Sequence, residues 1–257
     1  MKKWILTIVL SLAISSTAHA GLVSYWDFDE GMGTTAHDFV SSNDGTIYGA
    51  SWTTGKVGGA LSFDGVNDYI NVGDVPSLDI SFAITLEAWA KTTKITNDTL
   101  ISKDDDAGNR EYYFGPSYDG NNPGRVRWAL DTTNGFQVID TSKIINDNQW
   151  HFIAATYDGS YLRTYIDGVE DSSSPVAQTG LILNTNAPFQ IGRKPNIGYE
   201  QYFQGMIDEV RVYNHALTPD EIINDMNFDG KAPAVPEPAT MILLGFGFIG
   251  GAMLRRK

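Results

Sequence analysis

Tight-turn dipeptides divide this 257-residue chain into short segments of similar length. They are Asp44-Gly45, Asp64-Gly65, Asp119-Gly120, Asn134-Gly135, Asp158-Gly159 and Asp167-Gly168. The segments between them are rich in Val, Ile, Thr, Tyr, Phe and Trp, which favour extended backbone. The clearest hairpin covers residues 150–166, where two alternating runs flank Asp158-Gly159. Many short strands joined by tight turns predict an all-β chain that folds as an antiparallel two-sheet sandwich.

Only one stretch carries a good helix start signal. Thr218 suits the N-cap, Pro219 suits the first helical position, and Glu221 stands at the third position, where it completes a capping box. The sequence therefore predicts one short helix after the last strand.

The first residues of the chain have the pattern of an export signal. Two lysines precede an apolar run over residues 4–14, and Ala18 and Ala20 are small residues at the two positions that a signal peptidase reads. This pattern predicts a signal peptide over residues 1–20 and a mature chain that starts at Gly21.

The body of the chain is strongly acidic and contains no cysteine. The whole chain has 18 basic and 31 acidic residues, of which five basic and one acidic lie in residues 1–20 and 235–257. The remaining 13 basic and 30 acidic residues give a net charge of −17, which repels nucleic acid. Such a charge suits either a solubilising secreted surface or cation binding. The lack of cysteine excludes disulfides, thiol catalysis and thiolate metal sites.

The end of the chain differs in composition from the body. Residues 230–234 form a linker that leads into Pro236-Glu237-Pro238, and an apolar segment over residues 239–254 precedes Arg255 and Arg256. The apolar segment is slightly short for a stable span of roughly 17–25 residues. The basic end would stay in the cytoplasm by the positive-inside rule.

Five blocks of the sequence resemble the laminin-G-like, concanavalin A-like jelly-roll domain of many bacterial surface proteins. They are "LVSYWDFDEGMGTTAHD", "GGALSFDGVNDYINVGD", "FAITLEAWAK", "WHFIAATYDGSYLRTYIDG" and "GMIDEVRVYNHALTPDEI". The resemblance implies one jelly-roll sandwich domain over residues 21–229. It does not imply one function, because this fold hosts lectins, adhesion modules, pentraxins and glycan-cleaving enzymes.

The tail resembles the PEP-CTERM sorting signal of Gram-negative bacteria. The resemblance implies an exosortase-type processing enzyme as a partner, transient membrane anchoring through residues 239–254, and cleavage near Pro236-Glu237-Pro238. The protein would then reach the cell surface or the extracellular matrix. A permanent membrane anchor is the alternative interpretation.

Calcium is the most plausible cofactor. Asp64, Asn67 and Asp68 place three oxygen-bearing side chains in one tight turn, and oxygen ligands are what this hard cation requires. Asp208 has the inward phase of the last strand, and Asp38 is a weaker candidate in the first long loop. The alternative is that these side chains bond to nearby backbone amides, as Asp and Asn do in turns.

An acidic stretch over residues 103–115 occupies the position where pentraxins carry a calcium-binding Asp-Asn pair. Asp106 and Asn109 would correspond to that pair. The other half of such a site should follow the strand "QIG", but Arg193 and Lys194 stand there and would repel a cation. A solvated acidic loop is therefore the favoured interpretation of this stretch.

Five aromatic residues are candidates for stacking on a sugar ring. They are Tyr112, Tyr113, Trp128, Tyr199 and Tyr202. The alternative is that most of them are core or rim residues, since a sandwich buries every second strand position. The Glu-x-Asp-x-x-Glu string that concanavalin-like glycosidases use does not occur, and no other catalytic grouping follows from spacing. The favoured function is therefore non-covalent binding of extracellular polysaccharide or a surface protein. The alternatives are a passive structural component of a biofilm matrix and a glycan lyase or hydrolase.

Overall fold

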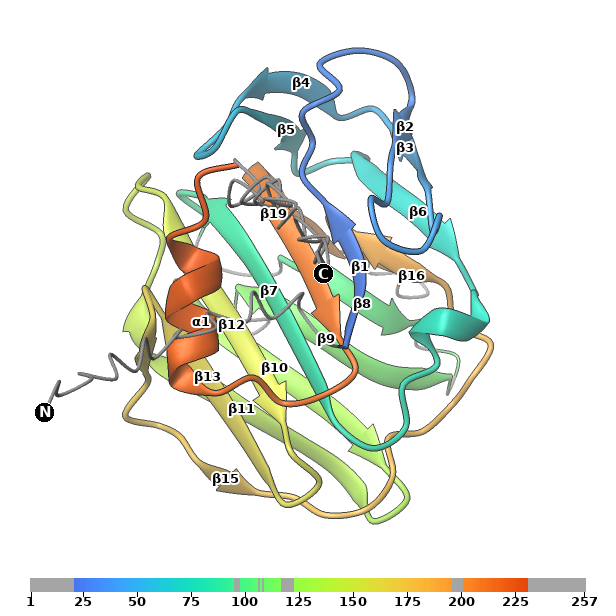
Figure 1. Ribbon diagram of the computed structural model, residues 1–257, viewed down its shortest axis with the longest axis vertical. Helices are drawn as coiled ribbons and strands as arrows, with labels where there is room; N and C mark the ends of the chain where they lie inside the picture. Colours follow the sequence, from blue (N-terminus) through green and yellow to red (C-terminus); the bar gives the residue numbers. More distant parts are fainter. Residues whose placement is uncertain are drawn as a thin grey trace, which may run out of the picture.

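The computed structural model describes residues 21–94, 98–105, 107, 109–116, 123–195 and 201–230. These residues form two large antiparallel sheets, as the turn and strand pattern predicts (Figure 1). The predicted signal peptide, the sorting tail and most of the linker lie outside the described residues.

The first sheet has nine strands, and its long central strands are β7 and β19. Its order is β14 (Val169–Glu170), β13 (Tyr161–Ile166), β12 (His151–Tyr157), β7 (Ile84–Lys91), β19 (Gln204–Tyr213), β5 (Gly59–Asp64) and β4 (Ser51–Thr54). Two further strands join it from the side, β1 (Leu22–Trp26) on β19 and β15 (Val176–Ala177) on β13.

The second sheet has eight strands and lies against the first. Its order is β11 (Gly135–Ile144), β10 (Arg125–Thr132), β9 (Arg110–Pro116), β8 (Ile101–Asp104), β16 (Phe189–Ile191), β6 (Tyr69–Gly73), β3 (Gly45–Tyr48) and β2 (Thr35–Ala36). A separate two-stranded ribbon pairs β17 (Arg193–Lys194) with β18 (Gln201–Tyr202). A short 3-10 helix spans Pro76–Leu78. The predicted all-β sandwich is thereby confirmed.

The hydrophobic core fills the space between the two sheets. Trp26 of the first sheet stacks on Phe189 of the second, with ring centroids 5.4 Å apart. Trp128 lies edge-on to Phe114 at 6.2 Å, and both side chains are fully buried. Large aromatic side chains of this kind each bury a large apolar area, which helps to stabilise a domain without disulfides.

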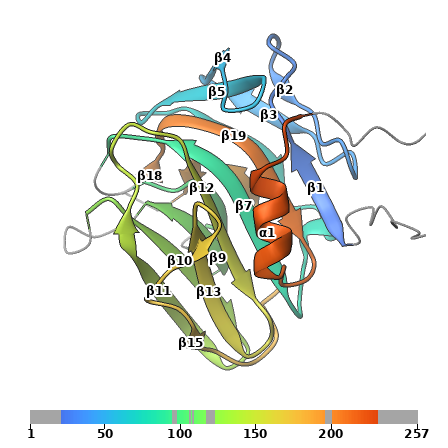
Figure 2. The same cartoon turned by 60° about the vertical axis from the view of Figure 1, so that its left-hand side comes forward.

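The predicted helix is α1 (Pro219–Met226), and it packs on the outer face of the nine-stranded sheet (Figures 1 and 2). The capping box is present: the Thr218 hydroxyl accepts a hydrogen bond from the Glu221 amide, and the Glu221 carboxylate accepts one from the Thr218 amide. Ile222 of α1 belongs to a small cluster with Trp89 and Phe152 of the sheet. This second layer explains why β7 is buried along both faces.

No helix within the described part of the chain is both long and apolar enough to cross a membrane. The predicted membrane segment, residues 239–254, lies outside that part.

A buried lysine ties several segments together at one end of the sandwich. The ammonium nitrogen of Lys103 lies 2.6 Å from a Glu111 oxygen, 3.0 Å from Asp79 and 3.1 Å from Asp74. It also donates to the backbone carbonyl of Thr185 at 3.3 Å. The side chains of Lys103 and Glu111 are fully buried. We call these four charged residues the Lys103 cluster.

Candidate functional site

Two tyrosines stack on each other on the outer face of the eight-stranded sheet. Tyr48 of β3 and Tyr69 of β6 are direct partners in the antiparallel register, so their side chains project from the same face. Their ring centroids are 4.6 Å apart and their planes differ by 10°. The neighbouring Ile47 and Ile70 point into the core, which places both tyrosines on the outside.

The two-stranded ribbon extends this stack with a cation and a third ring. The guanidinium carbon of Arg193 lies 4.6 Å from the centroid of the Tyr69 ring and 5.5 Å from that of Tyr202. The Tyr69 and Tyr202 centroids are 6.3 Å apart. We call Tyr48, Tyr69, Arg193 and Tyr202 the tyrosine row.

The open end of the tyrosine row is Tyr48. The Tyr48 ring covers one face of the Tyr69 ring, and Arg193 also lies close over that ring. Two groups at these distances cannot share one face, so Arg193 covers the opposite face of Tyr69. Tyr48 is 44% exposed and contributes the free aromatic face. A planar apolar face beside polar groups is the surface that packs against the C–H side of a sugar ring.

An unused hydrogen-bond acceptor lies beside the row. Gln190 of β16 is opposite Asn71 of β6, two residues along the strand from Tyr69. Its side chain is almost fully buried, and its amide nitrogen donates to the Asn71 oxygen at 3.4 Å. Its amide oxygen finds no hydrogen-bond partner among the described residues. This oxygen is itself buried, so it is not exposed to a ligand on the tyrosine row.

The turn predicted to bind calcium borders the tyrosine row. Asp68 directly precedes Tyr69, and its carboxylate packs against Gly49, the residue after Tyr48. Gly49 has a φ of +77°, and a Cβ there would lie only 1.9 Å from an Asp68 oxygen, so glycine is required. The two chain segments that carry the tyrosines are therefore held together by this turn.

The carboxylates of the turn already bond to backbone amides. Asp64 accepts hydrogen bonds from the amides of Val66 at 2.7 Å and Asn67 at 3.3 Å, and Asp68 accepts one from the amide of Asp64 at 2.9 Å. Asp64 and Asn67 are exposed to solvent. These bonds are the ordinary chemistry of Asp in turns, and calcium binding here stays a prediction.

Asp208 and Asp38, the other predicted calcium ligands, lie elsewhere. Asp208 accepts hydrogen bonds from the amides of Lys56 and Val57 in the β4–β5 turn. Asp64 is opposite Gln204, four residues from Asp208 along β19 and therefore ~13 Å away. Asp38 accepts hydrogen bonds from four backbone amides, those of Tyr25, Val40, Ser41 and Asn43.

These five residues thus do not form one metal site. Within the described ranges, no group of three or more His, Cys, Asp or Glu side chains is arranged to hold a metal ion.

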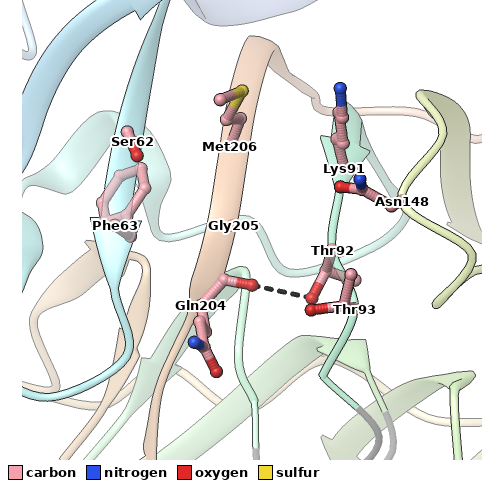
Figure 3. A pocket seen from close by; sticks show the side chains of 9 residues that line it. All are labelled: Ser62, Phe63, Lys91, Thr92, Thr93, Asn148, Gln204, Gly205 and Met206. Carbon is pink, nitrogen blue, oxygen red and sulfur yellow. Dashed lines mark hydrogen bonds between the residues drawn. The ribbon is translucent and has the colours of Figure 1, made fainter.

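A pocket of about 220 Å³ opens on the nine-stranded sheet beside the end of β19 (Figure 3). Figure 3 shows its lining: Ser62, Phe63, Lys91, Thr92, Thr93, Asn148, Gln204, Gly205 and Met206. The Thr92 hydroxyl donates to the Gln204 carbonyl at 2.7 Å and so links two segments that line the pocket. The polar lining is made of hydroxyl, amide and ammonium groups.

A family model described as the concanavalin A-like lectin/glucanases superfamily matches residues 64–223. The chain belongs to this superfamily. A second family model, the PEP-CTERM protein-sorting motif, matches residues 234–257. That motif marks the protein for export and for exosortase-dependent delivery to the cell surface or beyond it.

Several solved structures share the lectin-like sandwich. Domain 4 of the extracellular arabinanase AbnA from Geobacillus stearothermophilus, solved in complex with arabinotriose, aligns with a TM-score of 0.64 and 23% identity over 80% of this chain and 98% of that chain. The binding domain of Paraclostridial Mosquitocidal Protein 1 aligns with a TM-score of 0.63 and 18% identity over 81% of this chain and 52% of that chain. At these identities the likeness shows the fold alone.

Curated relatives contain the lectin-like domain as a small part of much longer chains. Human pappalysin-1 is 25% identical over 115 residues, which is 44% of this chain and 7% of that protein. The adhesion G-protein coupled receptor V1 of Danio rerio is 28% identical over 154 residues, which is 58% of this chain and 2% of that protein.

Two of the predicted sugar-stacking residues of the lectin-like domain are core residues, and their prediction was wrong. Tyr112 and Trp128 have no exposed surface, and they pack against each other between the sheets with centroids 6.2 Å apart. Tyr113, on the outer face, is nearly buried beneath the ammonium of Lys194. Tyr202 lies in the tyrosine row, and Tyr199 lies outside the described residues.

The acidic stretch of the lectin-like domain is less solvated than the sequence indicated. Asp104 is fully buried at the end of β8, and the ammonium of Lys194 lies 3.4 Å from its carboxylate. Asn109, beyond the strand end, bonds to Asp105 through its side chain at 2.6 Å, and Asp106 lies outside the described residues. The positive charge after the strand "QIG" therefore neutralises a carboxylate of this stretch.

Asp208 gives the lectin-like domain a measurable pH dependence. Burial raises the pKa of Asp208 from 3.8 to about 8, so the fold favours its protonated form. The unfolded chain releases this proton at a lower pH than the folded chain, and the free energy of unfolding therefore falls between about pH 4 and pH 8.

Asp208→Asn cannot titrate, and its side-chain oxygen still accepts from Lys56 and Val57. The native chain loses stability as the pH rises, and the variant does not lose this contribution. We therefore expect the free energy of unfolding of Asp208→Asn, minus that of the native chain, to increase by a few kcal/mol from about pH 4 to pH 8. Urea unfolding at several pH values measures this difference. Asp208→Ala, which loses both amide contacts, should be destabilised at every pH. A difference between Asp208→Asn and the native chain that stays constant with pH would contradict the assignment.

Proposed function

We propose that the protein is an exported glycan-binding protein, and that the tyrosine row is its binding surface. The observation that carries the proposal is the row itself, a stack of aromatic rings and one guanidinium that ends in the free face of Tyr48. Sugar rings pack their C–H faces on aromatic rings, and their hydroxyls bond to amide and guanidinium groups.

Binding rather than cleavage fits the known relatives. The solved structures with the same fold include a domain in complex with arabinotriose and several receptor-binding domains of toxins. Since their identities to this chain are low, they support a recognition role without naming the ligand.

The sorting tail supports a ligand outside the cell. A signal peptide over residues 1–20 would direct export, and the apolar segment over residues 239–254 would hold the chain in the membrane until an exosortase-type enzyme cleaves near Pro236-Glu237-Pro238. The acidic domain would then act at the surface or in the extracellular matrix. Calcium is proposed as an optional cofactor at the turn of Asp64, Asn67 and Asp68, which borders the row.

The test is a binding measurement on the purified protein with arabino-, cello- and chito-oligosaccharides, and with the exopolymer of the producing cells, each with and without calcium. We expect saturable binding to at least one probe and no release of reducing sugar. A protein that only self-associates, with no saturable binding to any probe, would contradict the proposal and favour a passive matrix component. Release of reducing ends would favour a lyase or hydrolase.

A further inference from the structure

The pocket of Figure 3 lies on a different surface from the tyrosine row. Ser62, Met206 and Lys91 line it and are register partners on β5, β19 and β7, so their side chains project from one face of the nine-stranded sheet. The residue next to each of them in its strand belongs to the hydrophobic core, so this face is the outer one. The tyrosine row lies on the outer face of the other sheet.

The polar side chains of the pocket are largely unused by the fold. Ser62, Lys91, Thr93, Asn148 and Gln204 line the pocket, and none of these five side chains has a hydrogen-bond or ion-pair partner among the described residues. They carry hydroxyl, amide and ammonium donors, and an ammonium has no acceptor capacity. The pocket therefore presents a surplus of donors to whatever enters it.

The segments that carry these donors are fixed to one another through their backbones. The amide of Asn148 donates to the carbonyl of Thr92 at 3.0 Å, and the hydroxyl of Thr92 donates to the carbonyl of Gln204 at 2.7 Å. Asn148 has a φ of +64°, a left-handed conformation that asparagine tolerates better than most residues. The lining is thus formed before any ligand binds, which lowers the entropic cost of binding.

Lys91 is the one charged residue of the lining, and it is basic. Acidic residues outnumber basic ones by 30 to 13 in the body of the chain, but none of the nine lining residues is acidic. Eight other lysines and arginines of the described ranges pair with a carboxylate within 4 Å. Lys91 has no such carboxylate among the residues that the structure describes.

The carboxylates next to the pocket are bonded elsewhere. Asp64 is opposite Gln204 in the register, and its oxygen accepts hydrogen bonds from two amides of its own turn. Asp147 precedes Asn148 in the chain and contacts the ring of His151 at 3.1 Å. More remote carboxylates are largely screened, because the Debye length is ~8 Å at physiological ionic strength. The ammonium of Lys91 is therefore available to an anion from outside.

The size of the pocket limits the ligand to one small unit. Its volume of about 220 Å³ lies below the ~300–1,000 Å³ that is usual for small-molecule sites. At ~30 Å³ for each water molecule, it holds roughly seven waters. Phe63 and Met206 add apolar surface to the lining, which suits the C–H groups of a sugar ring.

We infer that this pocket binds a single uronic acid unit, whose carboxylate pairs with Lys91 and whose hydroxyls bond to the amides of Asn148 and Gln204. A sugar acid combines the acceptor-rich anion, the hydroxyls and the C–H surface that the lining matches. The site does not depend on the tyrosine row, and each site can bind its ligand without the other.

The test is an NMR titration of the purified ¹⁵N-labelled protein with glucuronate and galacturonate, and with glucose, galactose and lactate as controls. We expect saturable shifts of the amides of Lys91, Thr93 and Asn148, and at least tenfold tighter binding of one uronate than of its neutral sugar or of lactate. Lys91→Met should weaken uronate binding about tenfold, because it removes a hydrogen bond to a charged group.

Lys56→Met is the matched control for the pocket. Lys56 lies over the ring of Trp89, on the same face of the sheet but outside the lining, and its loss changes the net charge equally. This variant should bind the uronate as tightly as the native chain. Thermal unfolding of both variants shows whether an affinity change comes from loss of the fold.

Each contrary outcome overturns a defined part of the inference. Binding of glucose or galactose as tight as that of the uronates would overturn the role of the carboxylate, and equally tight lactate binding would overturn the sugar. Unchanged uronate binding in Lys91→Met, or shifts confined to Tyr48 and Tyr69, would overturn the pocket as the site. Absence of uronate binding would overturn the inference and leave glycan binding at the tyrosine row intact.

Discussion

Lys103→Met is expected to lower the free energy of unfolding by about 3–5 kcal/mol, because removing one partner of a buried ion pair leaves uncompensated charge. The variant would leave Glu111 fully buried without its nearest cation, with Asp79 and Asp74 close by. Methionine keeps most of the lysine volume, so the loss reports charge rather than a cavity. Urea unfolding at neutral pH measures it.

Two further variants make the Lys103 prediction specific. Lys143→Met removes a half-exposed lysine that pairs with Asp167 and should cost less than about 1 kcal/mol, as surface ion pairs do. Lys103→Met combined with Glu111→Gln removes the stranded charge and should recover part of the loss. A loss of stability in Lys103→Met no larger than that in Lys143→Met would contradict a stabilising role for the Lys103 cluster.

Tyr48→Ala is expected to weaken glycan binding by at least tenfold, the largest effect of any single change on the surface. It removes the free aromatic face, and a buried aromatic contact contributes roughly 0.5–1.5 kcal/mol beyond its buried area. Tyr69→Ala should have a similar effect, because Tyr69 supports Tyr48 and Arg193 at once. Calorimetric titration with the oligosaccharide that binds best measures the affinity of both variants.

Tyr161→Ala is the matched control for the tyrosine row. Tyr161 lies on β13 of the other sheet, is 42% exposed against 44% for Tyr48, and also has an arginine, Arg163, near its ring. The Tyr161→Ala variant should bind glycan as tightly as the native chain. Equal losses in Tyr48→Ala and Tyr161→Ala would place the binding surface elsewhere.

The fold was predictable because its signals are local. The hairpin of residues 150–166 needs only alternation and a tight turn, and β12 and β13 pair around Asp158-Gly159 as that pattern predicts. The helix α1 follows from its capping box. The family blocks then indicated the jelly-roll class of sandwich, which alternation and turns alone do not specify.

The site was harder to predict because it depends on pairing between distant segments. Alternation gives each strand two faces but does not say which one is buried. Tyr112 and Trp128 therefore stayed candidates for sugar stacking although they fill the core. Tyr48 and Tyr69 were missed because nothing local pairs β3 with β6 in the register that stacks them. Their alternation with Ile47 and Ile70 was the one available signal.

The buried charges show the same limit. Lys103 and Asp104 lie in a stretch that looks like a solvated acidic loop, but both are fully buried. Their partners Asp79 and Lys194 are distant in sequence and come together only in the folded sandwich. Sequence reasoning identified the repelling effect of Arg193 and Lys194 on a cation, but it could not identify the carboxylate that Lys194 neutralises.

Glycan binding at the tyrosine row is tested most directly by a crystal structure of the protein grown with the oligosaccharide that binds best. We predict a sugar ring packed on the free face of Tyr48, with its hydroxyls close to Arg193. A well-ordered oligosaccharide bound at another surface, with the Tyr48 face unoccupied, would contradict it.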